Sequence, residues 1–222
     1  MTTKKRKKRL RKGRLLLVLI ILGLIVYGIY KYVDIKVNTI YISGNNILTD
    51  QEIIEIANLD NNPSYIKNVT LVIKDKLEKN VYIKEAKVTK GLLSIKIKID
   101  EASVLYIDKK TNEKVTIKGK IKDEKIVCAP YLINEAPKEK TDGFKNAMTK
   151  IDNDMLCQMS EIKYDPNDID KDRYYVYMND GNSVYLTVNK FKKLNKYNSI
   201  LENIGKQNGT LYLDYGDYFE AK

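Results

Sequence analysis

The sequence predicts an α+β protein that a single N-terminal helix anchors in a membrane. Three observations support this prediction. Residues 15–30 form an uncharged, almost wholly aliphatic run, which is typical of a membrane helix. Residues 93–100 alternate strictly between apolar and polar side chains, which is typical of a half-buried strand. From Val104 onward, short apolar runs between polar turns predict a second, mixed α/β domain that is rich in β-structure and built on an antiparallel sheet.

The positive charge of the chain is concentrated in a short basic tail, residues 1–14. The 222-residue chain has 40 basic and 29 acidic side chains and a formal net charge of +11. Nine of the basic side chains lie before residue 15, and the first acidic side chain is Asp34. The rest of the chain is therefore nearly balanced in charge, and it lacks the basic surface that nucleic-acid phosphates require.

The apolar run predicts a membrane helix at residues 15–33, in which the Lys31 side chain reaches the headgroup region. Residues 15–30 include twelve Leu, Ile or Val side chains, which favour insertion by roughly 4–7 kcal/mol. No small-x-small cleavage pattern follows this run, so we expect an uncleaved anchor rather than a signal peptide. By the positive-inside rule, the tail stays in the cytoplasm and residue 34 onward lies outside.

The segment after the anchor predicts a small domain at residues 34–102. Thr49 and Glu52 are spaced as a capping box at the start of a helix. Gly44 or Asn45 fits the positive φ of the turn before that helix. We expect a strand, two helices and two strands, at residues 37–42, 49–58, 63–80, 83–89 and 93–100. A three-stranded sheet with both helices on one face fits this order.

Residues 103–222 are expected to form the β-rich domain. Asp180-Gly181 between two strand-like runs is a strong hairpin signal, and a helix capped by Asn189 and closed by Gly205 follows. The other expected elements are strands at 104–107 and 115–117, a helix at 144–155, strands at 174–178 and 183–188, and a last strand at 210–214, with a short apolar run at 126–129. No Gly- or Pro-rich linker precedes Val104, so we expect the two domains to pack together.

The sequence argues against catalysis. It contains no histidine, which excludes Ser–His and Cys–His nucleophiles, and it lacks a Gly-rich phosphate loop and a CxxC site. The acidic stretch at residues 165–172 does not place Gly and Glu where an EF-hand needs them. We therefore predict no catalytic residue, no metal site and no cofactor. Glycoside hydrolysis needs only two carboxylates, so a membrane-anchored cell-wall enzyme stays open as an alternative.

The two cysteines, Cys128 and Cys157, are too few for a disulfide framework. We expect two semi-buried thiols, which behave as small apolar side chains. The sequence leaves a single bridge between them open.

Aromatic residues are dense near the C-terminus, from Leu211 to Phe219. Aromatic side chains anchor protein interfaces, and a terminal strand can offer its edge to a partner strand. The same tyrosines would also serve to cover the core beneath an interior strand. Composition alone leaves both interpretations open.

Six segments together carry a family resemblance. Three of them are an apolar strand with a Gly-Asn turn and helix cap (Ile40–Thr49), a helix followed by a strand (Lys76–Val88) and a closing strand with an acidic end (Leu93–Glu101). The others are a hairpin, a Lys- and Leu-bearing helix and a terminal strand, at Asp180–Leu186, Lys193–Ile204 and Gly209–Asp214. Their order and spacing resemble the FtsQ/DivIB family of bacterial cell-division proteins. The resemblance implies a polypeptide-transport-associated (POTRA) domain followed by a β domain.

The resemblance also implies a non-catalytic scaffold of the divisome. In this family the region around the last strand binds a coiled-coil membrane protein of the FtsB/DivIC type, itself paired with an FtsL-like protein. We expect strand addition there, so proline at Tyr212 or Leu213 should remove a main-chain donor and abolish binding if that donor faces the partner. The implied partner-binding residues are Thr210, Leu211, Tyr212, Leu213, Asp214, Tyr215, Tyr218 and Phe219.

A single-pass plasma-membrane protein of this kind, with other divisome proteins as further partners, is expected at the division septum. The main alternative is a POTRA-bearing scaffold of another envelope pathway, such as secretion or sporulation. A ring of the protein at midcell would favour division.

Overall fold

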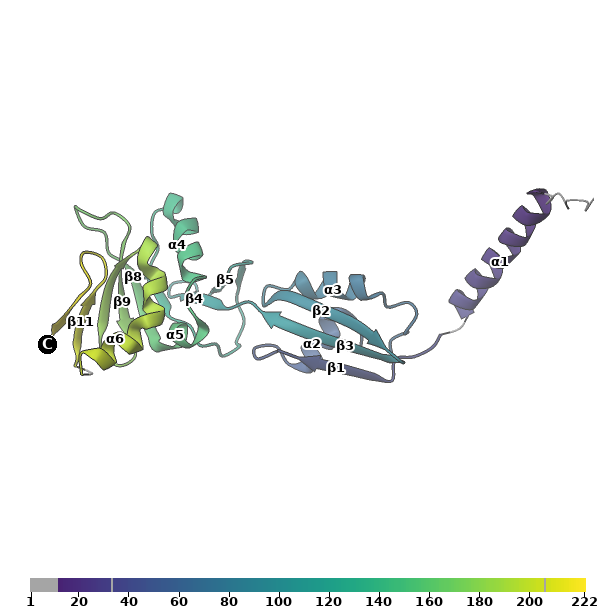
Figure 1. Ribbon diagram of the computed structural model, residues 1–222, viewed down its shortest axis with the longest axis horizontal. Coiled ribbons are helices and arrows are strands. Elements are labelled where there is room, and N and C mark those ends of the chain that lie inside the picture. Colours follow the sequence, from purple (N-terminus) through teal and green to yellow (C-terminus); the bar gives the residue numbers. More distant parts are fainter. Residues whose placement is uncertain (1–11, 33, 206) are drawn as a thin grey trace, which may run out of the picture.

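The computed structural model describes residues 12–32, 34–205 and 207–222 and shows three parts in a row (Figure 1). An apolar helix comes first, a domain with a three-stranded sheet lies in the middle, and a domain with a nine-stranded sheet lies at the other end. We call the last two the three-stranded domain and the nine-stranded domain. Residues 1–11 of the basic tail, and Val33 of the predicted membrane helix, lie outside the described residues.

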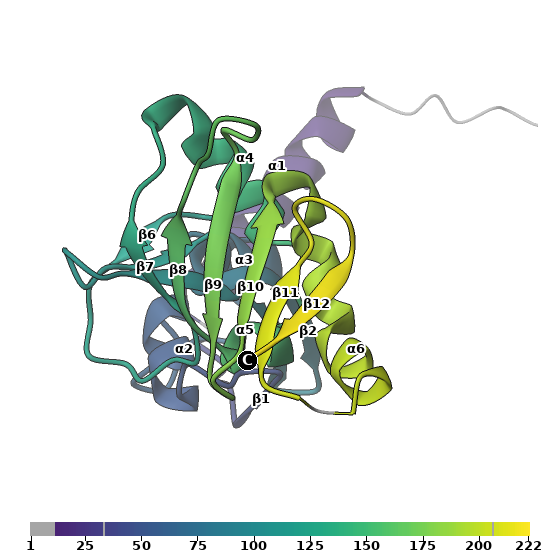
Figure 2. The same ribbon diagram turned by 90° about the vertical axis from the view of Figure 1, so that its left-hand side faces the viewer.

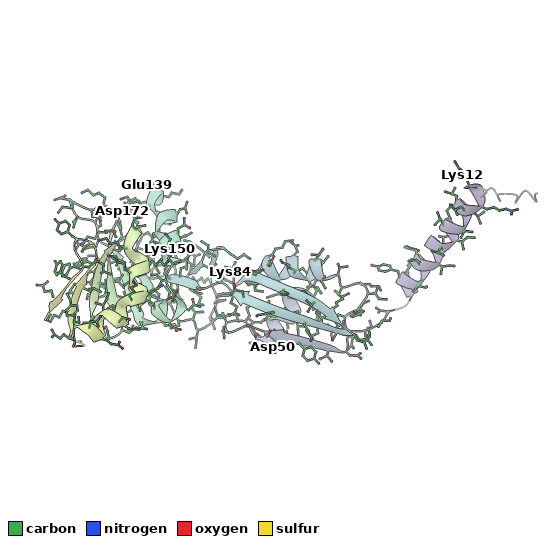
Figure 3. All side chains as sticks on the ribbon, viewed as in Figure 1. Lys12, Asp50, Lys84, Glu139, Lys150 and Asp172 are labelled. Atoms are coloured by element: carbon green, nitrogen blue, oxygen red, sulfur yellow. A yellow bond between two sulfur atoms is a disulfide. The ribbon has the colours of Figure 1, made fainter. Side chains whose placement is uncertain are left out.

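The N-terminal helix α1 (Lys12–Tyr32) has the length and composition of a membrane span. At 1.5 Å per residue its 21 residues extend about 31 Å, which matches the hydrocarbon thickness of a bilayer. The helix stands apart from both domains with side chains projecting on all sides (Figure 3), and Leu24 is 65% exposed. A helix that is apolar on all sides needs an apolar surrounding, so α1 fits the predicted anchor.

The three-stranded domain has the element order that the sequence predicts. Its elements are β1 (Thr39–Ser43), α2 (Asp50–Ala57), α3 (Thr70–Glu78), β2 (Ile83–Gly91) and β3 (Ser94–Glu101). Strand β3 lies in the centre, parallel to β1 and antiparallel to β2. Ile53 of α2 and Leu77 of α3 join Ile95, Ile97 and Ile99 of β3 in one buried cluster, so both helices cover the apolar face of the sheet.

The local signals before α2 are confirmed. Thr49 Oγ1 accepts a hydrogen bond from the Glu52 N–H, and a Glu52 carboxylate oxygen accepts one from the Thr49 N–H at 2.8 Å. Gly44 has a φ of +87°, and a Cβ there would lie 2.2 Å from the Ile99 carbonyl oxygen. Both the conformation and the close approach therefore require glycine.

Two predicted boundaries in this domain are wrong. The second helix begins at Thr70 rather than at Pro63, because the backbone of residues 63–65 bonds to the chain that leaves the anchor. The Val37 N–H donates to the Pro63 carbonyl at 2.9 Å, and the Tyr65 N–H donates to the Ile35 carbonyl at 2.7 Å. Leu93 belongs to the turn between β2 and β3, with a φ of +52°, and not to the strand.

The end of β3 is tied to the loop before α2 by one carboxylate. Glu101 accepts backbone N–H bonds from Asn46 and Ile47 at 2.8 Å and from Leu48 at 2.9 Å. A carboxylate that accepts several amide protons makes strong, charge-assisted bonds. The acidic residue that ends the predicted closing strand therefore fixes the entry to α2.

The nine-stranded domain places its strands in the order β12-β11-β10-β9-β8-β7-β4-β5-β6. Figure 2 shows β7 to β12 side by side. Most neighbours are antiparallel, whereas β4–β7, β7–β8 and β10–β11 are parallel. The strands are β4 (Val104–Asp108), β5 (Lys114–Thr116), β6 (Lys120–Ile121), β7 (Tyr131–Asn134), β8 (Met159–Tyr164), β9 (Arg173–Met178), β10 (Ser183–Thr187), β11 (Gly209–Tyr212) and β12 (Tyr218–Ala221).

Helices pack against one face of this sheet. They are α4 (Thr141–Met148), α5 (Asn153–Gln158), η2 (Val188–Lys196) and α6 (Tyr197–Asn203), and the short helix η1 (Lys138–Lys140) leads into α4. Phe144 of α4 stacks on Tyr174 of β9 with 4.7 Å between ring centroids, and Phe191 of η2 meets both rings edge-on. The predicted single helix at 144–155 is two helices, and the predicted cap Asn189 lies inside η2.

The short apolar run at residues 126–129 forms no strand, because this segment crosses the three-stranded domain instead of pairing in a sheet. We call residues 122–130 the strap. Val127 and Ala129 pack on the core of the three-stranded domain. Lys125 Nζ lies 2.6 Å from a Glu52 oxygen and holds the pKa of that carboxyl below its usual value. The Tyr82 hydroxyl donates to Asp123 at 2.9 Å. The two domains therefore pack together, as the sequence predicts.

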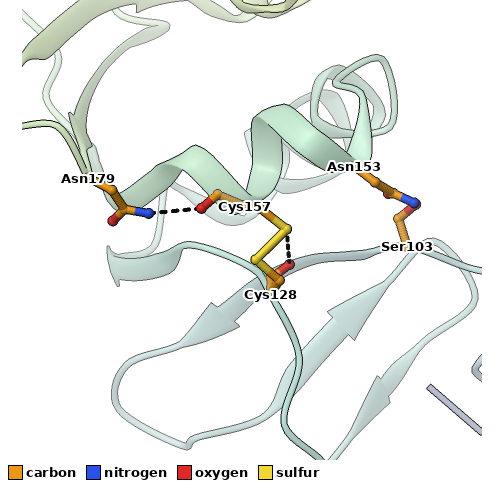
Figure 4. Close-up of a disulfide and its surroundings, with 5 residues drawn as sticks. All are labelled: Ser103, Cys128, Asn153, Cys157 and Asn179. Atoms are coloured by element: carbon orange, nitrogen blue, oxygen red, sulfur yellow. Dashed lines mark hydrogen bonds between the residues drawn. A yellow bond between two sulfur atoms is a disulfide. The ribbon is translucent and has the colours of Figure 1, made fainter. Parts of the chain in front are cut away.

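The expected pair of free thiols is also wrong. Cys128 of the strap and Cys157 of α5 form a disulfide (Figure 4), with their Cα atoms 5.0 Å apart. That separation lies within the usual range for disulfides. The bridge ties the strap to the nine-stranded domain while Lys125 ties it to the three-stranded domain, so the strap links both.

Candidate partner-binding surface

The C-terminal segment forms two strands and not the single last strand predicted at 210–214. The chain turns back at Gly216, which has a φ of +79°, and β12 pairs antiparallel to β11. On its other side β11 pairs in parallel with β10, and the Leu213 N–H continues this pairing by donating to the Tyr185 carbonyl at 2.7 Å. The predicted edge strand is therefore interior, and β12 is the edge of the sheet.

The eight residues predicted to bind a partner differ widely in exposure. Leu211 and Leu213 are each only 2% exposed and belong to the core of the nine-stranded domain. Tyr215 and Tyr218 are 79% and 52% exposed. The half-buried members of the set are Thr210, Tyr212, Asp214 and Phe219. Proline at Leu213 would break a bond inside the sheet, so it does not test the free edge.

The free edge of β12 presents backbone groups of Phe219 and Ala221. The Lys222 N–H donates to the Asn208 carbonyl at 2.9 Å, and the register pairs Glu220 with Thr210 and Tyr218 with Tyr212. Hydrogen bonding alternates along an antiparallel strand, so Tyr218 and Glu220 bond inward while Phe219 and Ala221 point their N–H and C=O groups outward. Sequence reasoning missed Ala221, because an outward backbone group leaves no side-chain signal.

A row of tyrosine rings crosses the sheet on the face opposite the helices. Tyr185, Tyr212 and Tyr218 lie on β10, β11 and β12, with centroids 5.4 Å and then 4.6 Å apart. The Tyr212 hydroxyl donates to Glu220 at 3.0 Å, and this bond raises the pKa of Tyr212. The row ends at the exposed ring of Tyr218, beside the free edge.

A groove of about 620 Å³ lies next to this edge on the helix side. Its apolar floor includes Leu211, Leu213 and Ile200, and lysines of η2 form its rim. Lys193 Nζ lies 2.5 Å from Asp217 and holds the pKa of that carboxyl below its usual value. Lys192 and Lys196 are exposed. The groove therefore offers apolar contacts under a positive rim.

A nearly buried ion pair holds the turn between β11 and β12. Arg173 Nε lies 2.8 Å from Asp214 Oδ2, and the two side chains are 14% and 10% exposed. The Arg173 guanidinium also lies over the Tyr185 ring, 3.7 Å from its centroid. Arg173 therefore connects the turn, the tyrosine row and β9.

We expect Arg173→Ala to lower the free energy of unfolding by about 2–3 kcal/mol, because it leaves the Asp214 carboxylate buried without its partner. Urea unfolding measures the change. Arg173→Lys keeps the charge but loses the planar donors and the stacking, so an intermediate loss is expected. The double variant Arg173→Ala/Asp214→Ala should lose less than the sum of the single losses. Strictly additive losses would contradict a coupled pair.

The described part of the chain, residues 12–32, 34–205 and 207–222, contains no cluster of three or more Cys, Asp or Glu side chains that could hold a metal ion. The C-terminal corner combines a backbone edge, stacked rings and a lysine-rimmed apolar groove, which are features that protein interfaces use.

Comparison with known proteins identifies relatives along most of the chain. The family model described as "POTRA domain, FtsQ-type" matches residues 35–101, which include all elements of the three-stranded domain. Cell division protein DivIB of Listeria monocytogenes is 29% identical over 238 residues, covering 98% of this chain and 85% of that protein. DivIB of Geobacillus kaustophilus is 30% identical over 193 residues, covering 82% and 74%.

A solved structure also matches part of the chain. It is the major extracytoplasmic domain of the trans isomer of the cell division protein DivIB from Geobacillus stearothermophilus. The match has 24% identity and a TM-score of 0.38, and it covers 48% of this chain and 96% of that one.

Proposed function

Because this chain belongs to the FtsQ/DivIB family of cell division proteins, we propose that it serves cell division as a membrane-anchored scaffold that binds other divisome proteins. Its relatives are cell division proteins, and its α1 helix is long and apolar enough to cross a membrane. In this proposal the basic tail lies in the cytoplasm, both domains lie outside, and the protein gathers at the septum. It works by binding and not by catalysis.

The observation that carries the proposal is the free edge of β12. An unpaired edge strand is a template for another strand, and natural proteins usually shorten, charge or cover such edges. Here the edge is flanked by the exposed Tyr218 ring and by the lysine-rimmed groove. An incoming strand would bond to Phe219 and Ala221, and acidic side chains next to it would meet Lys192 and Lys196.

We propose that the occupant is a coiled-coil membrane protein of the FtsB/DivIC type, paired with an FtsL-like protein. Tyr215, Tyr218 and Phe219 contact it directly, with Thr210 and Tyr212 on the adjacent strand. Leu211 and Leu213 contribute the groove floor, and Asp214 fixes the turn through Arg173.

Ala221→Pro tests this proposal, because it removes an outward N–H without breaking a bond inside the sheet. We expect the full-length variant to retain at least about tenfold less coiled-coil partner from detergent-solubilised membranes than the wild-type chain. Ala221→Gly, which keeps the N–H, should bind normally. Mass spectrometry identifies and quantifies the retained proteins.

Equal retention of the same partner by Ala221→Pro and Ala221→Gly would contradict strand addition at β12 and move the site elsewhere. Retention of no divisome protein by the wild-type chain would contradict the scaffold itself.

A further inference from the structure

One end of the three-stranded domain lies close to the C-terminal end of α1. Helix α1 ends at Tyr32, and by Val37 the chain is already bonded to Pro63. The four Cα–Cα steps from Tyr32 to Lys36 span at most about 14 Å when fully extended. Figure 1 shows that the β2–β3 turn and the segment before α3 lie at this same end. We call this end, residues 35–38, 63–72 and 91–94, the anchor-proximal end.

Large apolar side chains are exposed at the anchor-proximal end. Leu92 is 95% exposed, Leu71 74%, Val72 53% and Val69 50%. Single exposed apolar residues are common on protein surfaces, but a group of them at one end indicates a contact. The segments that carry them are joined, because the Tyr65 hydroxyl donates to the Gly91 carbonyl at 2.7 Å and the Asn38 N–H donates to the Leu93 carbonyl at 2.8 Å.

The turn between β2 and β3 gives an independent observation. Gly91 pairs with Ser94, so Leu92 and Leu93 are the two turn residues. Leu93 has a φ of +52°, a conformation that turns normally give to Gly or Asn. Turn geometry therefore does not account for two leucines here, and Leu92 makes almost no contact within the protein. Strained positions of this kind often belong to functional sites.

Charged side chains at this end suit a lipid headgroup region. Lys67 is exposed, and Lys90 lies over the Tyr65 ring, 4.5 Å from its centroid. Asp34 is paired with Lys36 at 2.6 Å. Lysines beside exposed leucines are the composition of interfacial membrane-binding surfaces, in which apolar side chains enter the headgroup–acyl boundary and ammonium groups meet phosphates.

We propose that the anchor-proximal end docks onto the outer leaflet of the membrane that α1 crosses, with Leu92 and Leu71 at the headgroup–acyl boundary. This inference rests on the membrane anchoring proposed above for α1. Docking would restrict the rotation of the three-stranded domain about its short connection to α1. It would thereby hold the nine-stranded domain at a fixed height above the bilayer.

Single tryptophans test the docking, because the chain contains no native tryptophan. Full-length variants Leu92→Trp, Leu22→Trp and Ile169→Trp are placed in nanodiscs of phosphatidylcholine and phosphatidylglycerol, with or without dibrominated acyl chains. Leu22 lies inside α1, and Ile169 is an 87% exposed apolar residue between β8 and β9. Bromine quenches indole fluorescence only at short range, so the loss reports contact with lipid.

We expect strong quenching for Leu22→Trp, clear but weaker quenching with a blue-shifted emission for Leu92→Trp, and none for Ile169→Trp. Adding Leu71→Ser and Val72→Ser to Leu92→Trp should reverse the quenching at position 92. Quenching of Leu22→Trp without quenching of Leu92→Trp would overturn the docking and leave the anchor intact. Absence of quenching at both positions would overturn the anchor as well.

Discussion

Ile95→Asp is expected to unfold the three-stranded domain. Ile95 is fully buried on the central strand β3, between Ile40 of β1 and Lys90 of β2. The substitution removes a packed side chain and places a carboxylate in an apolar core without a partner. The combined loss of about 5 kcal/mol or more equals the whole stability of many small domains. Circular dichroism during thermal unfolding measures it.

Lys98→Asp is the matched control, because it introduces the same side chain on the exposed face of the same strand. We expect this control to keep a native unfolding transition. A native transition for Ile95→Asp as well would contradict the buried position of Ile95. Loss of the transition in both variants would indicate that β3 tolerates no acidic residue on either face.

Sequence reasoning worked best where structure is set by neighbours in the chain. The Thr49–Glu52 capping box, the positive φ of Gly44 and the isoleucine alternation of β3 each depend on residues a few positions apart. These local rules gave the order of all five elements in the three-stranded domain. The limits 34–102 and 103–222 of the two domains stay predictions.

The strands of the nine-stranded domain were harder to predict from the sequence, because tyrosine occurs on both faces of its sheet. In β9, Tyr174 is fully buried while Tyr175 and Tyr177 lie on the opposite face. Alternation between apolar and polar side chains is therefore hidden, although the Asp180-Gly181 hairpin was clear. The strap and the disulfide depend on contacts between the two domains, which spacing along the chain does not reveal.

The candidate site was likewise only partly predictable from the sequence. Terminal tyrosines directed attention to the corner of the molecule that holds the candidate site, but the edge itself consists of backbone groups of β12. Gly209 sets how closely β12 approaches β11. The sequence analysis identified Gly209 only as the start of a strand. Its N–H donates to Asn182 Oδ1 at 2.7 Å, and a Cβ there would lie 2.0 Å from the Glu220 carbonyl oxygen.

Gly209→Ala is therefore expected to separate β12 from β11. The added methyl group would also lie 2.9 Å from the Ala221 Cα, so backbone atoms and not a flexible side chain would have to move. If β12 carries the partner, affinity should fall by about 100-fold or more, equivalent to about 2.7 kcal/mol. The remaining strands keep their core, since β12 supplies only the partly buried Phe219 to it.

Hydrogen exchange and partner affinity, measured on the same full-length variant, separate the outcomes. The amides of Tyr218 and Glu220 should lose protection, whereas those of the interior strands β9 and β10 should keep it. Gly143→Ala is the control, because a Cβ at Gly143 in α4 meets no atom within 4 Å. Loss of β12 protection with unchanged affinity would place the partner on another surface. Unchanged protection and affinity together would mean that the strands accommodate the methyl group, and the close approach of β12 at Gly209 would then have no role in binding.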